Sequence, residues 1–142
     1  MNKNILTAKK ILIENNYTCV LYSNGIEHHS TLRGVKPLID FLESDCEFRG
    51  FFAADKVVGA GAAHLYVLLG VKAVWAKLMS KDAVDILQTN GIDACYDDVV
   101  PYIINRSGDG ACPIEEAVKG INDSNQALII ITKTLEKLLK QA

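Results

Sequence analysis

The sequence predicts an α/β fold with three layers, in which helices cover both faces of a mixed sheet of about five strands. Helical and strand-like segments alternate over residues 35–104, and this alternation requires crossover connections that make the strands parallel. Before them, Asn24-Gly25 joins two short β-rich runs, a strong short-range signal of an antiparallel hairpin. We therefore expect a sheet that begins with a hairpin and continues with parallel strands.

Each element has a local signal. Apolar residues three and four positions apart predict the first and last helices, Pro37 suits the first turn of the second helix, and Ser80 caps the fourth. Pro101 favours an edge or a bend for the last strand. The predicted strands cover residues 17–22, 26–32, 51–54, 73–79 and 95–104, and the predicted helices cover residues 4–16, 35–42, the segment between Lys56 and Gly70, 81–89, 114–119 and 124–139.

Length and composition are those of one globular domain over residues 1–142. Hydrophobic residues make up 49% of the chain and charged residues 23%. The formal charge of −2, without a basic cluster interleaved with aromatic residues, argues against a nucleic-acid partner. The N-terminus lacks the apolar core of a signal peptide, and no run approaches the roughly 18 apolar residues of a membrane helix. We expect a cytoplasmic protein with no membrane partner.

The four cysteines, Cys19, Cys46, Cys95 and Cys112, are scattered without a C-x-x-C pair. Structural zinc sites usually draw ligands from closely spaced pairs, and small disulfide scaffolds are denser in cysteine. The spacing predicts free thiols in a reducing compartment, and no metal.

The stretch from Phe48 to Gly70 predicts a ligand site. Its apolar run, residues 51–54, has the character of a buried strand, and Asp55-Lys56 follows as a turn before the next helix. In open α/β sheets, ligands bind beyond the carboxyl ends of the strands, where helix N-termini present unpaired N–H groups. We therefore expect Asp55 and Lys56 to lie together in this crevice, with a purely structural ion pair as the alternative.

Residues 59–64 have the pattern G-x-G-x-x-H, an incomplete dinucleotide-binding fingerprint. His64 replaces the third glycine, and no carboxylate clearly ends the next strand. The alternative is that small residues let the helix pack tightly on the sheet and that His64 belongs to the core or its rim. We expect no cofactor. His28 and His29 are adjacent on a strand and point to opposite faces, so they cannot chelate one metal ion.

A second candidate segment is NRSGDGACPIEE, residues 105–116. It delivers Cys112 to the N-terminus of a short helix, where the dipole and free N–H groups favour a thiolate, and Arg106 adds positive charge if the loop folds back. Glu115 and Glu116 in the first turn oppose this effect. Cys112 is therefore either a reactive thiol or a weak helix cap after a sharp turn.

Three segments, RGVKPL at residues 33–38, ADKVVG at 54–59 and VPYIINR at 100–106, with Cys112-Pro113, resemble a family known as domain of unknown function 1893. The order of elements is similar to the cytidine-deaminase-like fold. In deaminases, the helix after the hairpin opens with His- or Cys-x-Glu and the next with Pro-Cys-x-x-Cys, which supply three zinc ligands and an acid/base Glu. Residues 34–36 and 55–59 hold no such ligand here, so the resemblance implies this fold without zinc.

Two functions stay open. The first is a zinc-independent enzyme, of hydrolase type, that acts on a small polar or anionic molecule. Asp55 and Lys56 would be its acid/base or electrostatic groups, and Cys112 its nucleophile. Hydrolytic deamination by the usual mechanism is not expected, because it needs a metal to lower the pKa of water from about 16 to about 7. The second is a non-catalytic ligand-binding or accessory protein with a redox-sensitive thiol.

The ligand would be a small molecule held at the helix N-termini. The ligand-binding residues expected there are Gly34, Gly59 and Arg106. The apolar C-terminal helix and the strand over residues 71–79 form a candidate interface for a homodimer.

Overall fold

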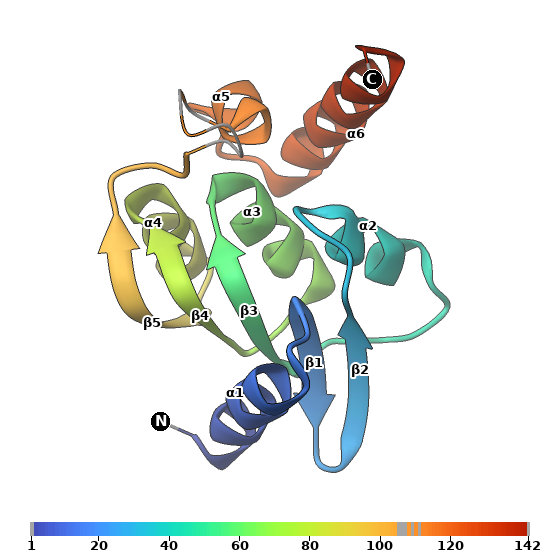
Figure 1. Cartoon of the computed structure of the whole chain (residues 1–142), viewed down its shortest axis with the longest axis vertical. Helices are drawn as coiled ribbons and strands as arrows, with labels where there is room; N and C mark the ends of the chain where they lie inside the picture. The colour runs from blue at the N-terminus through green and yellow to red at the C-terminus, as the bar shows by residue number, and fades with distance from the viewer. Residues whose placement is uncertain (1, 105–107, 109, 111, 142) are drawn as a thin grey trace.

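Five strands form one mixed sheet, in the order β2-β1-β3-β4-β5, in the computed structural model, which describes residues 2–104, 108, 110 and 112–141. Helix α1 covers one face of the sheet, and α2, α3 and α4 cover the other (Figure 1). The predicted three-layer α/β fold is confirmed. The elements are α1 (Lys3–Asn15), β1 (Cys19–Ser23), β2 (Ile26–Ser30), α2 (Lys36–Glu43), β3 (Phe52–Val58), α3 (Ala60–Leu69), β4 (Ala73–Ser80), α4 (Lys81–Thr89), β5 (Asp93–Val100), α5 (Pro113–Val118) and α6 (Ser124–Gln141).

The predicted hairpin is present as β1 and β2. These strands pair antiparallel up to Ser23 opposite Ile26, so only two residues form the turn. Asn24 and Gly25 both have positive φ, at 44° and 93°, which a type I′ turn requires and which Asn and Gly tolerate best. The local sequence thus sets the register of the first two strands.

The second half of the sheet is parallel, as the crossovers predict. β3 pairs parallel with β4 and β4 with β5, whereas β1 pairs antiparallel with β3. β5 is an edge strand that ends just before Pro101, as the position of this proline favours. β4 is hydrogen-bonded on both sides and largely buried, so the expectation that this strand contributes to a subunit interface is wrong.

The length of β3 differs from the prediction. The strand was expected to end at Ala54, with Asp55-Lys56 as a turn, but it continues to Val58. Asp55 is paired with Cys19 on one side and Ala76 on the other, so both neighbouring strands hold it in the sheet. The chain leaves the strand only at Gly59, whose extended backbone precedes the first turn of α3.

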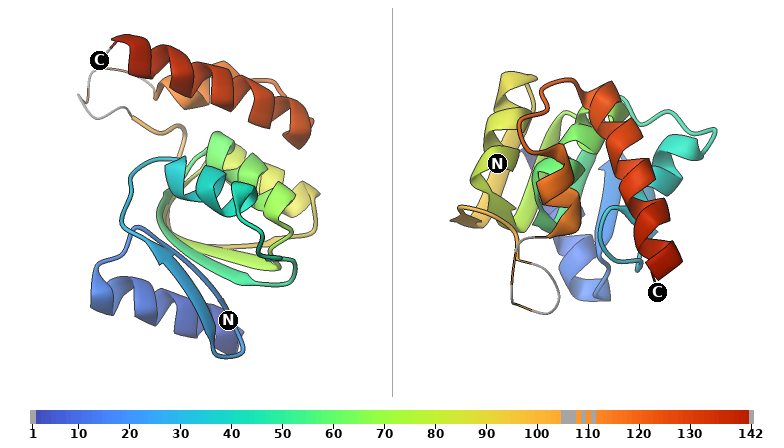
Figure 2. Two further views of the ribbon diagram at one scale, coloured as in Figure 1. Left: turned by 90° about the vertical axis from the view of Figure 1, so that its right-hand side faces the viewer. Right: turned by 90° about the horizontal axis from the view of Figure 1, so that it is seen from above.

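Helix α3 joins the sheet to the C-terminal helices. A Cβ added to Gly61 would lie 2.6 Å from Cγ2 of Ile114 in α5 and 3.6 Å from Cδ1 of Ile131 in α6. Gly61 therefore admits α5 and α6, which stack on the outer side of α3 (Figure 2). The alanines of α3 belong to the core cluster that also contains residues of β3 and β4. No helix in the described part of the chain is long and apolar enough to span a membrane.

His64 is a core residue of this helical layer, as one of the two interpretations held. Its side chain is 1% exposed, with Nε2 3.1 Å from the carbonyl oxygen of Ile121 and Nδ1 2.9 Å from Oγ of Ser124. The carbonyl can only accept, so Nε2 carries the proton and Ser124 donates to Nδ1. Burial lowers the pKa of His64, and its neutral form thus ties the start of α6 to α3.

The close contact at Gly61 predicts a stability effect. We expect Gly61→Val to lower the free energy of unfolding by about 2 kcal/mol, because its branched side chain overlaps Ile114. Denaturant unfolding measures this loss. The double variant Gly61→Val, Ile114→Ala should lose at least about 1 kcal/mol less than the sum of the two single losses, since the second change removes the clashing methyl. Additive losses would show that this contact does not limit packing.

Candidate functional site

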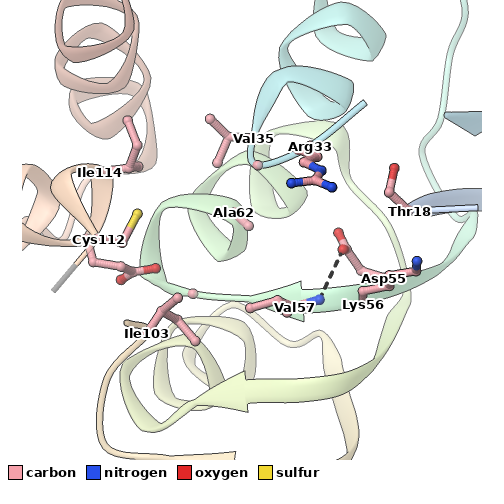
Figure 3. A pocket seen from close by; sticks show the side chains of 13 residues that line it. Thr18, Arg33, Val35, Asp55, Lys56, Val57, Ala62, Ile103, Cys112 and Ile114 are labelled. Atoms are coloured by element: carbon pink, nitrogen blue, oxygen red, sulfur yellow. Dashed lines mark hydrogen bonds between the residues drawn. The ribbon is translucent and has the colours of Figure 1, made fainter. Parts of the chain in front are cut away.

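A pocket of about 400 Å³ lies at the carboxyl end of β3 (Figure 3). The N-terminal ends of α2, α3 and α5, with the residues preceding each helix, form its walls. A pocket at this edge of the sheet is where the crevice rule predicts a ligand site. Its lining residues are Thr18, Arg33, Gly34, Val35, Asp55, Lys56, Val57, Gly59, Ala62, Ile103, Cys112, Ile114 and Glu115.

Asp55 supplies a buried carboxyl group to this pocket. Asp55 is 8% exposed, and its Oδ2 accepts a hydrogen bond of 2.6 Å from the hydroxyl of Tyr66 in α3. Oδ1 accepts a longer bond, 3.4 Å, from the backbone N–H of Val57. Burial raises the pKa of Asp55 to about 7, although the bonds from Tyr66 and Val57 act in the opposite direction. Near neutral pH the carboxyl group therefore populates both protonation states.

Tyr66 and Cys19 form a buried support beneath this carboxyl group. The Tyr66 oxygen lies 3.3 Å from Sγ of Cys19, and both side chains are inaccessible to solvent. Burial raises the pKa of both groups, so both keep their protons at neutral pH. Because the Tyr66 hydroxyl donates to Asp55, the Cys19 thiol donates to Tyr66 in turn. This chain of donors holds Asp55 in one orientation.

Lys56 does not join Asp55. Successive side chains of a strand point to opposite faces, and the ammonium of Lys56 turns toward α1, where Nζ donates a 3.0 Å hydrogen bond to Oδ1 of Asn16. Lys56 borders the pocket, but its charged end is exposed and lies on the other side of β3. Both residues line the pocket, but their charged ends have different partners, because the strand continues at the position where a turn was expected.

Arg33 was not predicted as a site residue, yet it faces the pocket. It lies between β2 and α2, directly before Gly34, whose φ of 67° turns the chain into the helix. Its guanidinium lies over the same end of the pocket as the carboxyl group of Asp55 (Figure 3). The available signal was a single arginine next to a glycine at the start of a helix, within the RGVKPL segment that resembles the family.

Glu115 fills the N-terminus of α3. Its Oε2 accepts a 2.8 Å hydrogen bond from the backbone N–H of Ala60, and burial is the main cause that raises its pKa. A Cβ on Gly59 would collide with this carboxylate, so the glycine makes room for Glu115. The position that a phosphate takes in a dinucleotide-binding fold is thus occupied by a side chain of the protein itself.

Cys112 lies in the same pocket, at the end opposite Asp55 (Figure 3). It precedes α5 as its N-cap residue, and its backbone N–H donates a 3.0 Å bond to the carbonyl of Ile103. The separation means that Asp55 cannot serve as the base for this thiol.

Of the three residues predicted to bind the ligand, Gly34 and Gly59 line the pocket, whereas Arg106 is outside the described residues.

The residues at the N-termini of α2 and α3 do not fit a zinc ion. Val35 caps α2, and Gly59, Ala60 and Ala62 open α3, so no side chain there can donate an electron pair to zinc. Over the described residues, no group of three His, Cys, Asp or Glu side chains is placed to hold a metal ion.

Comparisons with known proteins identify a family and similar solved structures. A family described as a domain of unknown function (DUF1893) matches residues 7–135. The crystal structure of a DUF1893 family protein from Thermotoga maritima is similar, with a TM-score of 0.84, 28% identity, and 96% of this chain and 92% of that chain covered. The dCMP deaminase of cyanophage S-TIM5 gives a TM-score of 0.46 and 16% identity, covering 68% of this chain and 99% of that chain. No curated protein matches.

The buried carboxyl group predicts a pH-dependent stability difference. The pKa of Asp55 is higher in the folded protein than in the unfolded chain, so the folded state binds the proton more tightly and loses stability as pH rises toward 7. Asp55→Asn removes this loss and can still accept from Tyr66. Relative to the unmodified protein, its free energy of unfolding should increase by about 2 to 3 kcal/mol between pH 5 and pH 8.

Denaturant unfolding at several pH values measures the free energy of unfolding of the Asp55→Asn variant and of the unmodified protein. Subtracting one from the other removes the contribution of His64, which both proteins contain. Asp98→Asn is the matched control, since Asp98 is an exposed carboxylate on β5. Its difference from the unmodified protein should stay constant over this range. A constant difference for Asp55→Asn as well would contradict the raised pKa.

Proposed function

The chain belongs to the DUF1893 family, and we propose that it is a metal-independent enzyme that exchanges a proton with a small polar molecule through Asp55. The observation that carries this proposal is a buried carboxyl group, with a pKa of about 7, that faces a cavity of about 400 Å³. A general acid or base works best when its pKa lies near the working pH. Cavities of this size commonly hold small ligands.

The two oxygens of Asp55 support different roles. Oδ2 is engaged by the short bond from Tyr66, whereas the bond of Oδ1 to Val57 is long, which leaves Oδ1 as the oxygen available to a ligand. In the ionised form, Oδ1 would take a proton from an N–H or O–H group of the ligand. Before this transfer, the Tyr66 hydroxyl would stabilise the negative charge of the Asp55 carboxylate. Asp55 would return the proton later in the reaction.

The rest of the pocket supports binding. Aliphatic side chains of Val35, Ala62 and Ile114 form its walls and reduce the amount of water around the reacting groups. Cys112 is at the far end, where it would contact the distal part of the ligand. Lys56 takes no chemical step in this proposal, because its ammonium is held by Asn16.

A ligand screen followed by turnover assays tests the proposed function. A library of small polar molecules is screened by thermal shift, and each compound that binds is incubated with protein and followed by mass spectrometry. We expect Asp55→Asn to lower kcat by about 10² or more and to change ligand affinity less, since proton transfer contributes mainly to the chemical step. Asp98→Asn should behave as the unmodified protein.

Two results would contradict the proposal in different ways. Ligands that bind in an Asp55-dependent manner but are never converted would favour a non-catalytic binding protein. Binding and turnover that are both unaffected by Asp55→Asn would show that Asp55 does not act on the ligand.

The support from Tyr66 gives a second prediction, which needs no ligand. Removing its hydroxyl in Tyr66→Phe removes a hydrogen bond that lowers the pKa of Asp55, so this pKa should rise above 7. NMR titration of the Asp55 carboxyl carbon measures it directly. Tyr22→Phe, a change on β1 outside the pocket, should leave the midpoint at about 7. An unchanged midpoint in Tyr66→Phe would show that this hydroxyl does not tune Asp55.

A further inference from the structure

Two groups of opposite charge face one end of the pocket without contacting each other. The carboxyl group of Asp55 lies on β3, and the guanidinium of Arg33 lies over it from the loop before α2 (Figure 3). In the described part of the chain, no ion pair joins them, and the Arg33 guanidinium makes no hydrogen bond to another side chain. A space between an acceptor and a cation suits a ligand that carries both complementary groups.

The different burial of the two residues gives the ligand a direction. Asp55 is 8% exposed, so a group that binds it must leave water almost completely. Arg33 is exposed, so its partner keeps part of its hydration. A cationic amine beside Asp55 would form a charge-assisted hydrogen bond with the carboxylate, in place of the water that the amine loses on binding. A carboxylate or phosphate at Arg33 would accept two hydrogen bonds from the planar guanidinium.

Ligands with only one charge fit less well. An amine without an anionic group would bring its positive charge near Arg33 and would leave the guanidinium without an anionic partner. An anion without an amine would bring a second negative charge toward Asp55. At the far end, Glu115 already occupies the N–H group of Ala60, so an anion has no equivalent position there.

We infer that the ligand of this pocket is a small zwitterion, with a cationic amine bound by Asp55 and an anionic group bound by Arg33. This inference rests on the proposed function and specifies its substrate class. The aliphatic side chains of Val35 and Ala62 would pack against the carbon chain between the two charged groups.

A series of ω-amino acids tests this inference with the full-length protein. Calorimetry compares glycine, β-alanine, 4-aminobutanoate and 5-aminopentanoate with butylamine, which has only the amine, and butanoate, which has only the carboxylate. Phosphoethanolamine distinguishes a phosphate from a carboxylate as the anionic group. We expect one zwitterion to bind roughly tenfold or more tightly than butylamine or butanoate.

Two variants test which residue binds each end of the ligand. Arg33→Gln should lower the affinity for the best zwitterion roughly tenfold and leave butylamine unchanged or improved. Asp55→Asn should remove the preference for that zwitterion over butanoate. The matched controls are Arg49→Gln and Asp98→Asn, exposed charges that do not line this pocket.

The outcomes separate this inference from the proposed function. If butylamine binds as tightly as every zwitterion, if Arg33→Gln leaves the preference intact, or if no zwitterion binds at all, the inferred substrate class is wrong. The proposed function survives these results if another compound from the library binds and is converted in an Asp55-dependent manner. It fails separately if Asp55→Asn alters neither binding nor turnover of any compound.

Discussion

The hydrogen bond between the Tyr66 hydroxyl and the Asp55 carboxyl group is the interaction on which the site depends. It joins the last half of β3 to the middle of α3, and the thiol of Cys19 on β1 extends it into the sheet. Three elements thus fix the orientation of one carboxyl group. The same enclosure makes ionisation costly, so the protein gives up folding stability at neutral pH to keep an acid in this position.

Helix α3 positions the other wall of the pocket. Its glycines allow α5 to approach, Glu115 binds its first N–H group, and His64 fixes the start of α6. The helix therefore contacts the sheet on one side and the C-terminal helices on the other (Figure 2). Any change that moves α5 relative to α3 would move Cys112 and Glu115 relative to Asp55, and so alter the length of the pocket.

Local signals were sufficient for the fold and for a pocket at the carboxyl end of β3. The Asn24-Gly25 turn, the alternation of elements and the crevice rule depend on neighbours in sequence, and each agrees with the structure. The details that differ depend on partners distant in sequence. Pairing of Asp55 with Cys19 and Ala76 extends β3, and this extension sends Lys56 to the opposite face.

Arg33, Tyr66 and Glu115 were not recognised as site residues for the same reason. Arg33 and Glu115 line the pocket from segments far apart in the sequence, and Tyr66 supports Asp55 from behind it, so no spacing along the chain brings the three together. Glu115 was considered only as a neighbour of Cys112, because its bond to Ala60 spans 55 positions of the sequence. Periodicity describes which face of an element is apolar, but it does not say which elements meet.

The attachment of Glu115 to α3 gives this pocket an internal competitor for anions. A carboxylate tethered to the same chain acts at an effective concentration of roughly millimolar or higher at its own binding position. Dissolved phosphate or the phosphate tail of a nucleotide would have to displace it before reaching the backbone N–H group of Ala60. The binding of a purely anionic molecule at this helix end is therefore weakened by the cost of displacing Glu115.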